Sequence, residues 1–313
     1  MTPRRALGID IGGTKIAAAM VDEDGTTATP LIVPTPAADG PDAILDAAAA
    51  LARRVMTEAG SIPEAVGLGS AGAFDLRGTV IHSTDHLAGW LGTRVGQGLE
   101  ARLDLPVTVL NDVHAAALGE LSVGPDRGVG PQLFVAVGTG IGGALIVNDR
   151  LIRGSSGMAG SVGHVRVRSE LSRQCSCGGR DHAEAFASGP AMERTYRERT
   201  GIDARLPSIG ERSRRGDSDA ADVIESATGR LAEALAAAIS VCDVETIILG
   251  GGVSGLGTIF TAPLSASLRA ELGARSPQVR VELAALGDRA TVVGAATAAW
   301  RIGTGSTIEE LFV

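Results

Sequence analysis

A carboxylate at the end of a buried strand could take a proton from a substrate hydroxyl. The apolar run PVTVLND spans residues 106–112 and ends on the polar pair Asn111–Asp112. Polar residues at the carboxyl end of a strand in an α/β sheet point toward a ligand crevice, and general-base catalysis there contributes roughly 10²- to 10⁴-fold. We therefore predict that Asp112 is the base of a transfer reaction. The alternative is that Asp112 caps a helix beginning at residue 113, and the two roles can coexist.

Three glycine-rich turns follow apolar runs and could hold the phosphates of a nucleotide. They lie at 12–14, 138–143 and 250–252. Because glycine has no Cβ, a phosphate can approach the backbone closely, and successive N–H groups form an anion-binding concavity. Thr14 and Thr139 add hydroxyl donors. One such turn is often only a structural hairpin, but three of them favour a nucleotide site.

A further carboxylate, Asp10, lies at the end of the first apolar run, just ahead of the first glycine turn. Magnesium prefers oxygen ligands, keeps several of its waters and travels with nucleotide phosphates. We predict that Asp10 holds a water of such a magnesium ion.

Two cysteines and two histidines supply a set of four soft or borderline metal ligands. They are His164, Cys175, Cys177 and His182. Such a set suits a closed tetrahedral zinc site. Since the C-x-C-G-G-x-x-H spacing differs from that of a zinc finger, reduced thiols and surface histidines are the alternative. We predict a structural zinc that orders the glycine-rich segment 154–190.

These residues need an alternating α/β framework to position them. Residues 5–21 predict a strand, a glycine turn and a second strand, and the run that begins at residue 133 repeats that plan, which suggests two similar lobes. Residues 210–219 are expected to form a solvated loop. Helices are predicted at 41–59, 113–121, 218–241, 258–272 and 289–302, and further strands at 65–69, 106–112 and 278–284.

Composition excludes several classes of protein. With 313 residues, 44% of them hydrophobic, the chain is long enough for two packed cores. A net charge of -8 and only 3% aromatic residues argue against a nucleic-acid partner. No apolar run reaches the ~20 residues of a membrane span, and the opening MTPRRALGIDIGG has no signal-peptide core. We expect a cytoplasmic protein that binds neither nucleic acid nor membrane.

In their order along the chain, the motifs resemble those of the ROK sugar kinases (repressor, open reading frame, kinase). This family includes bacterial glucokinases and N-acetylmannosamine kinase, within the actin and hexokinase superfamily. The resemblance covers nearly the whole chain and is carried by DIGGTK (10–15), Asn111–Asp112, GTGIGGA (138–144), the Gly-His pair of SVGHV, CSCGG with Glu184, and LGGGVS (249–254).

The resemblance implies an α/β fold of two RNase H-like (actin/hexokinase-type) domains, with ATP and sugar meeting in an interdomain cleft. The smaller N-terminal domain would comprise residues 1–112 plus 290–313. The larger domain would comprise residues 113–289 and carry the zinc loop at 160–185. Homodimers or homotetramers are what the family implies.

The resemblance also implies a role for each motif. Asp112 would be the base, and His164 would both ligate zinc and touch the sugar. The sugar-binding residues would be Asn111, His164 and Glu184, with Gly72 and Thr84 as further sugar-loop positions and Ser161 also at the sugar site. The ligands of ATP and Mg²⁺ would be Asp10, Gly12, Gly13, Thr14, Lys15, Gly138, Thr139, Gly140 and Gly142, with Gly250, Gly251 and Gly252 at the adenosine end.

Two departures from the family pattern concern the acceptor and the metal. Ser161 stands where the family usually has a glutamate that grips sugar hydroxyls. A hydrogen bond to a charged group is worth roughly 1.5 to 3 kcal/mol, so its loss would weaken glucose binding by about one to two decades. His182 replaces the third zinc cysteine, next to Asp181 where a glycine is usual. The zinc site would then have two cysteines and two histidines.

We therefore expect an ATP-dependent kinase that acts on the primary hydroxyl of a hexose or hexose-like polyol. Because of Ser161, the acceptor could instead be an N-acylhexosamine or a cyclitol. The alternative from another class is a non-catalytic sugar-binding regulator. Repressors of the family carry an N-terminal helix-turn-helix domain, and since DIGGTK begins at residue 10 we expect none here. An actin-like ATPase would leave the sugar-loop matches unexplained.

Overall fold

The structure, a computed structural model, describes residues 5–83, 87–123, 130–275, 279–303 and 307–312. The chain forms two compact units. Unit 1 comprises Met1–Gly128, Asp149–Ala159 and Asp288–Val313, and unit 2 comprises Val129–Asn148 and Gly160–Gly287. Each unit combines a sheet with helices, so the α/β class predicted from the alternating pattern is confirmed.

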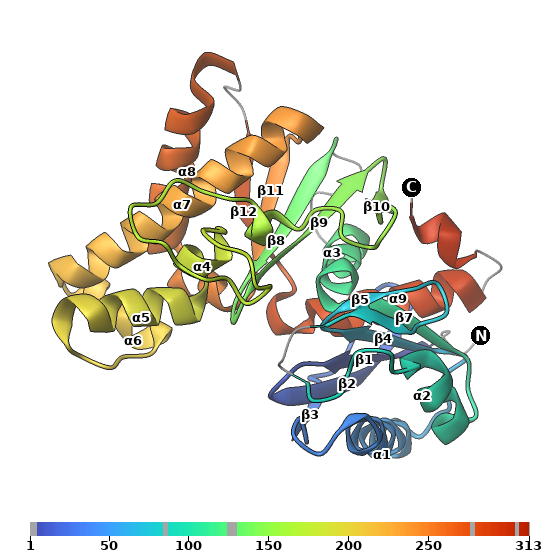
Figure 1. The fold of residues 1–313 in the computed structure, drawn as a ribbon. Coiled ribbons are helices and arrows are strands. Elements are labelled where there is room, and N and C mark those ends of the chain that lie inside the picture. The colour runs from blue at the N-terminus through green and yellow to red at the C-terminus, as the bar shows by residue number, and fades with distance from the viewer. Residues whose placement is uncertain (1–4, 84–86, 124–129, 276–278, 304–306, 313) are drawn as a thin grey trace. The chain divides into compact units, whose positions relative to one another are not determined.

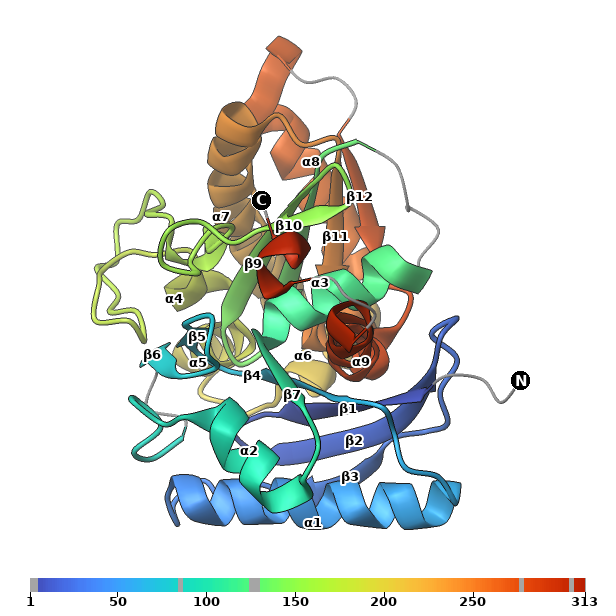
Figure 2. The same cartoon turned by 90° about the vertical axis from the view of Figure 1, so that its right-hand side faces the viewer.

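Unit 1 is built on a sheet with the strand order β3-β2-β1-β4-β7. β1 and β2 form the predicted antiparallel hairpin, whereas β4 and β7 continue the sheet in parallel. Figure 2 shows α1 and α2 on one face of this sheet and α3 and α9 on the other. The strands are β1 (Arg5–Ile11), β2 (Lys15–Asp22), β3 (Leu31–Pro34), β4 (Val66–Ser70), β5 (Ala73–Phe74), β6 (Val80–His82), β7 (Val107–Asn111) and β10 (Arg150–Ile152), and the helices are α1 (Pro41–Ala59), α2 (Val95–Leu103), α3 (Asp112–Val123) and α9 (Ala290–Gly303).

Helix α1 has the bounds that the sequence predicts. Pro41 begins it, where a missing N–H costs nothing, and Gly60 ends it in the left-handed conformation with φ 61°. Its apolar face, which includes Ile44, Leu51 and Val55, is buried in the core of unit 1. This face anchors one side of the sheet, so the other side is left for α3 and α9.

Glycines let α9 approach both the sheet and α3 closely. A Cβ added at Gly67 in β4 would overlap the carbonyl oxygen of Ala295, and one added at Gly294 in α9 would overlap the carbonyl oxygen of Ala115. Since no other residue fits such a contact, the backbones of α3 and α9 pack against each other directly. This packing fixes the helix whose first residue is Asp112.

Helix α3 is part of unit 1, whereas the division expected from the sequence placed residues 113–289 in the second domain. The difference has a physical cause, because α3 buries its face against α9 and β4. Residues 149–159 also belong to unit 1, where Leu151 pairs with Phe312.

Unit 2 repeats the strand, glycine turn, strand plan. Its strands lie in the order β9-β8-β11-β12, with β8 and β9 antiparallel and β8, β11 and β12 parallel. The long helices α7 and α8 lie side by side (Figure 1). The strands are β8 (Gln132–Val137), β9 (Ile141–Val147), β11 (Thr246–Gly250) and β12 (Arg280–Leu283), and the helices are α4 (Glu184–Ala187), α5 (Gly189–Thr200), α6 (Leu206–Arg214), α7 (Ser218–Cys242) and α8 (Thr258–Leu272).

The prediction of a solvated loop at 210–219 is wrong. Helix α6 covers Leu206–Arg214, and α7 begins at Ser218. Leu206 and Ile209 bury one turn of α6 in the core, although the charged residues that follow conceal this apolar face in the sequence. Arginine and glutamate are also good helix formers, so polarity was a poor guide to a loop.

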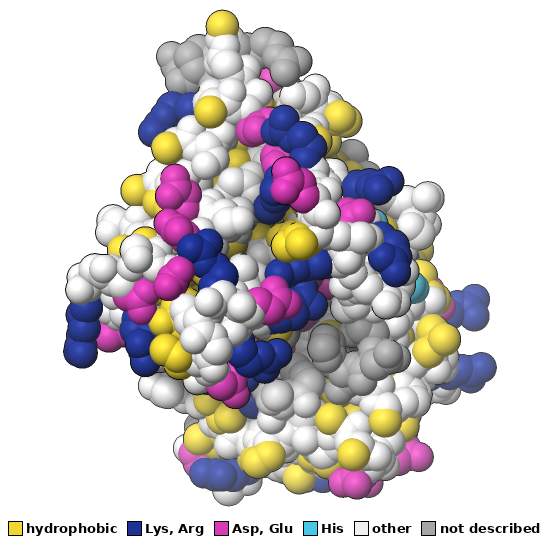
Figure 3. Space-filling model, turned by 60° about the vertical axis from the view of Figure 1, so that its left-hand side comes forward, with side chains coloured by type: hydrophobic (Ala, Val, Ile, Leu, Met, Phe, Trp, Pro, Cys, Tyr) yellow, Lys and Arg dark blue, Asp and Glu magenta, His cyan; other side chains and the backbone are white. Residues whose placement is uncertain are grey.

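Charged side chains of both signs are interleaved on the face that Figure 3 shows. Such pairs occur within unit 2, where Arg199 donates to Asp219 at 2.9 Å and to Asp222 at 2.7 Å. Among the described residues, no helix is long and apolar enough to cross a membrane.

Candidate active site

The pair Asn111–Asp112 lies where β7 ends and α3 begins. Asn111 Oδ1 accepts the N–H groups of Val113 at 2.9 Å and His114 at 3.1 Å. These are the donors that the start of a helix leaves unpaired. Asn111 therefore does the capping that was the alternative role for Asp112, although Asp112 shares the N–H of Val113.

The carboxylate of Asp112 is anchored by one of its oxygens. Oδ1 accepts from Asn111 Nδ2 and from the Val113 N–H, both at 2.9 Å. Burial raises the pKa of Asp112 above its usual range, and these hydrogen bonds oppose the rise. A carboxylate with a raised pKa is a stronger proton acceptor, which suits a general base.

The structure brings the predicted sugar-loop position Gly72 next to Asn111. Asn111 Nδ2 donates to the Gly72 carbonyl oxygen at 2.9 Å. Gly72 has φ 112°, and an added Cβ would lie 2.7 Å from the His82 carbonyl oxygen, so glycine is required. The other sugar-loop position, Thr84, lies outside the described residues.

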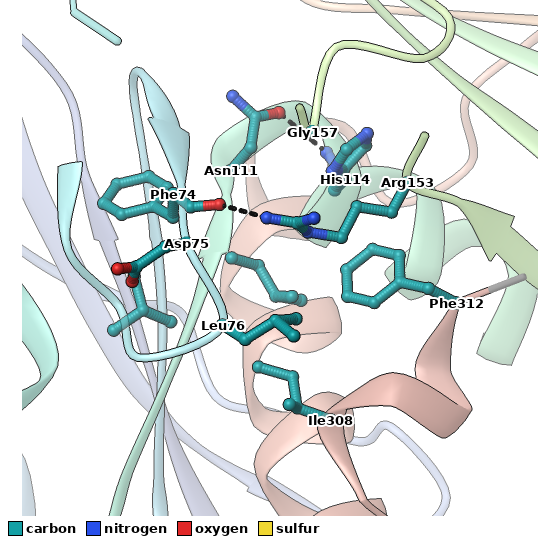
Figure 4. Close-up of a pocket in the computed structure, with 11 residues that line it drawn as sticks. Phe74, Asp75, Leu76, Asn111, His114, Arg153, Gly157, Ile308 and Phe312 are labelled. Carbon is teal, nitrogen blue, oxygen red and sulfur yellow. Dashed lines mark hydrogen bonds between the residues drawn. The ribbon is translucent and has the colours of Figure 1, made fainter. Parts of the chain in front are cut away.

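His114 and Asn111 both line a small pocket of unit 1 (Figure 4). The ring of Phe312 meets the imidazole edge to face, with centroids 5.9 Å apart. Burial lowers the pKa of His114 to about 4, so the imidazole is neutral at physiological pH. Across the pocket, Arg153 Nη2 donates to the Phe74 carbonyl oxygen at 2.7 Å. The imidazole beside the Asn111–Asp112 turn is thus uncharged and packs on the ring of Phe312.

Asp10 is close enough to Asp112 to sense its charge. The register pairs Asp10 with Gly69 in β4 and Gly69 with Leu110 in β7, so the ends of three strands lie together. Burial, and then the charges of Asp112 and Asp288, raise the pKa of Asp10 to about 7, and the Lys15 ammonium opposes them. A carboxylate whose pKa is raised by a neighbouring carboxylate favours a bound cation.

The first glycine turn is stabilised by two hydrogen bonds from Thr35, a residue that the sequence did not single out. Thr35 Oγ1 donates to the Gly12 carbonyl oxygen at 2.7 Å, and the Thr35 N–H donates to the Thr14 carbonyl oxygen at 3.1 Å. Gly13 is half-buried and Thr14 is exposed. Lys15 pairs with Asp288 at 3.2 Å. The turn is preformed, with its threonine hydroxyl at the surface.

In unit 2, the second and third glycine turns lie together. A Cβ added at Gly138 would lie 4.0 Å from the Gly252 nitrogen. Gly251 has φ 79° and packs against β8, where an added Cβ would lie 2.6 Å from the Val137 carbonyl oxygen. This neighbourhood follows from the pairing of β8 with β11, which sets Ala136 beside Gly250. Thr139 is exposed, and Gly140 and Gly142 are half-buried at the same end of the sheet.

Glu184 is buried next to the second glycine turn. Its Oε2 accepts the Ile141 N–H at 2.8 Å, and a Cβ added at Gly140 would lie 2.6 Å from the same oxygen. Its Oε1 accepts from Ser176 Oγ at 2.5 Å. Cys175 Sγ lies 3.3 Å from Oε1 as a second, weaker donor. Oε2 has the Ile141 N–H as its donor and keeps a lone pair, so Glu184 is already oriented and can still accept a hydroxyl.

The four predicted metal ligands form one cluster in unit 2. The ligand atoms of His164, Cys175, Cys177 and His182 all lie within 4.8 Å of one another. Cys177 Sγ is 3.2 Å from His182 Nδ1, and Cys175 Sγ is 3.6 Å from His164 Nδ1. Those separations are close to the spacing of ligands around tetrahedral zinc. The cluster therefore fits zinc.

Two further features of the loop accompany the cluster. Asp181 adopts φ 60°, a conformation that explains why a glycine is usual at this position. Its Oδ1 accepts the Arg173 N–H at 3.0 Å, a bond that glycine could not make. Burial first, together with the Glu184 charge, raises the pKa of Cys175 to about 12, so a thiolate at this position needs a cation beside it.

Ser161 precedes the 3₁₀ turn η1 (Val162–His164), and its carbonyl oxygen accepts the His164 N–H at 3.1 Å. The structure thus places Ser161 and His164 on one short turn.

Three supporting residues escaped the reading of the sequence. They are Thr35, which stands between two prolines, Ser176, which stands between two cysteines, and Phe312, which is far along the chain from His114. For Ser176, its place between the two cysteines was the available signal.

A family model described as "ROK family" matches residues 6–301 of the chain. The chain belongs to the ROK family. A glucokinase of Streptomyces coelicolor is 33% identical over 311 residues, covering 93% of this ROK chain and 96% of the relative. An N-acetylmannosamine kinase of Escherichia coli is 33% identical over 248 residues, covering 79% and 82% of the two chains.

A solved structure supports the fold of this ROK protein. It is a ROK family glucokinase of Streptomyces griseus in complex with glucose and AMPPNP, which is 34% identical. Its TM-score is 0.85, over 95% of this chain and 99% of the other.

Proposed function

We propose that this ROK protein is an ATP-dependent sugar kinase, which transfers a phosphoryl group to the primary hydroxyl of a hexose or hexose-like polyol. The observation that carries the proposal is the carboxylate of Asp112, anchored by Oδ1 at the end of β7 and with its pKa raised by burial. The glucokinase and N-acetylmannosamine kinase relatives support the same class of reaction.

In the proposed reaction, Asp112 is the general base. Because Oδ1 already accepts two hydrogen bonds, we assign proton acceptance to Oδ2. The hydroxyl of the sugar gives its proton to Oδ2 as its oxygen bonds the γ-phosphorus of ATP, and the bond from that phosphorus to the bridging β,γ-oxygen breaks to release ADP. Asn111 keeps Asp112 in place during this step.

The remaining roles are assigned by chemistry. The glycine turns offer backbone N–H groups to the phosphates, and Mg²⁺ would neutralise phosphate charge when bound, with Asp10 holding one of its waters. Glu184 and His164 would bind sugar hydroxyls. Zinc would be structural, since its four ligands leave no open position for a substrate.

Ser161 bears on the identity of the sugar. A serine cannot accept hydroxyl protons with the strength of a carboxylate, which weakens the expectation of glucose and leaves N-acylhexosamines and cyclitols as candidates. Ser161→Glu should lower the KM for glucose by about tenfold or more. Glucose kinetics that stay the same or worsen would show that this position does not set the preference.

The test of the proposed function is ADP release from ATP and Mg²⁺ in the presence of hexoses, N-acylhexosamines and cyclitols. A kinase gives sugar-dependent ADP with at least one acceptor. If a sugar binds by calorimetry but no acceptor raises ADP above background, the protein is a non-catalytic sugar-binding regulator instead.

A further inference from the structure

Ser176 links the metal loop to a residue of the proposed sugar site. It lies between two of the zinc ligands, and its hydroxyl donates to Glu184 Oε1 at 2.5 Å. Ser176 is exposed, whereas Glu184 is buried with 8% of its surface accessible. The hydroxyl therefore reaches inward from the loop to a carboxylate that the loop partly covers.

Glu184 in turn links this loop to the second glycine turn. Its other oxygen, Oε2, accepts the N–H of Ile141, the residue of that turn at which β9 begins. Gly140 lies against the same oxygen, so the carboxylate also fills the space beside the turn. One carboxylate thus bridges the metal loop and a turn that we assign to phosphate binding.

We propose that Ser176 is a positioning residue, which orients Glu184 toward the sugar and couples sugar binding to the glycine turn at 138–143. This inference rests on the proposed function, because it takes Glu184 as a sugar ligand. The chemistry is a short hydrogen bond from a neutral hydroxyl to a carboxylate, which is stronger than one between neutral groups. Cys175 Sγ also lies 3.3 Å from Oε1, but a thiol is a weak donor. Without the serine bond, the carboxylate therefore gains rotamers in which neither oxygen reaches its partner.

The coupling follows from the sharing of one rigid group. A sugar hydroxyl that binds Glu184 meets a carboxylate whose orientation is already fixed by hydrogen bonds from Ser176 and Ile141. Sugar binding therefore costs little side-chain entropy at Glu184. Conversely, a Glu184 side chain that changes rotamer no longer accepts the Ile141 N–H, and the glycine turn then loses a hydrogen bond that holds its backbone. Loss of the serine hydroxyl should therefore weaken the binding of both sugar and nucleotide, although its hydrogen bond is to Glu184 alone among the proposed sugar ligands that the structure describes.

The experiment compares Ser176→Ala with the full-length wild-type protein. Ser176→Thr keeps the hydroxyl. Ser172→Ala removes a serine of the same loop whose hydroxyl oxygen accepts a hydrogen bond from Arg180 instead. We expect Ser176→Ala to raise the sugar KM about tenfold to a hundredfold with a smaller change in kcat. Ser176→Thr should recover most of the loss, Ser172→Ala should match wild type, and zinc content measured by mass spectrometry should be equal in all four proteins.

A second readout needs neither sugar nor turnover. Hydrogen exchange at the Ile141 amide, followed by NMR in the sugar-free protein, should be faster in Ser176→Ala than in wild type and in Ser172→Ala. Unchanged Ile141 exchange, or a sugar KM within twofold of wild type, overturns the positioning role. If wild type phosphorylates no sugar, the proposed function fails, while the exchange result still decides whether Ser176 sets Glu184.

Discussion

Asn111 and Asp112 divide two tasks that a strand end often leaves to one residue. Asn111 uses its amide to cap α3, to hold Gly72 and to fix Oδ1 of Asp112. Asp112 is thereby left with one oxygen for chemistry. The sequence predicted both residues, but it gave no sign that the asparagine would bind the protein so extensively.

Asp10 predicts a pH dependence of stability. Its pKa is about 7 in the folded protein against 3.8 ordinarily, so folding favours its protonated form. The resulting stabilisation is fully present below pH 3.8 and is lost as the pH rises through 7, a change of up to about 4 kcal/mol. Asp10→Asn should therefore be more stable than wild type without Mg²⁺, by a margin that grows from pH 5 to pH 8. Urea unfolding at several pH values measures this margin.

The exposed Asp39→Asn is the matched control for that experiment, since it should shift stability little at any pH. A margin for Asp10→Asn that is constant or shrinks with rising pH would contradict the account of Asp10.

At the scale of elements, the contact between α3 and α9 determines where Asp112 lies. Gly294→Ala would push a Cβ into the carbonyl oxygen of Ala115 and force the two helices apart. We expect it to destabilise the protein by about 1 to 3 kcal/mol and to reduce kcat by moving the start of α3. Denaturant unfolding and steady-state kinetics measure the two effects.

Gly303→Ala is the control within the same helix, because an added Cβ there meets nothing within 4 Å. It should leave stability and kcat close to wild type. Equal behaviour of the two variants would mean that the helices do not need the glycine contact.

Elements with a strong local signal were predicted closely. The bounds of α1 and α8 agree with the sequence prediction, because Pro41 and Gly60 delimit α1 and an apolar pattern runs through α8. The short strands β5 and β6 and the helix α2 were not predicted, since their stability depends on contacts distant in sequence. Likewise, α6 buries only three of its nine residues, too few for a clear helical period.

The sequence predicted the residue types of the site better than the hydrogen bonds and packing contacts between them. Residue types and spacing indicated the Asp112 base, the glycine turns and the four-ligand metal cluster. The bonds of Glu184 to Ile141 and Ser176, and the packing of Phe312 on His114, join segments far apart in the chain. A single sequence carries no information about such pairs, so the structure was needed to find them.

At the scale of the whole molecule, each unit has its own hydrophobic core, and the metal cluster belongs to unit 2. Cys177→Ser should abolish stoichiometric zinc, because it removes one of four ligands. Hydrogen exchange should then rise in residues 160–188, while the sheet of unit 1 stays protected. Metal analysis and exchange mass spectrometry test this.

Cys242→Ser provides the comparison, since Cys242 packs beside the core of unit 2 outside the metal cluster. It should retain zinc. Full zinc content in Cys177→Ser would show that Cys177 is not a zinc ligand.

The most direct test of the account is the turnover of Asp112→Asn with the best acceptor found. The asparagine oxygen can accept the same hydrogen bonds from Asn111 and Val113, so the change removes basicity and little else. The account predicts that kcat falls by about a hundredfold or more, while calorimetry shows AMPPNP binding as in wild type. Turnover equal to wild type would show that Asp112 is not the base.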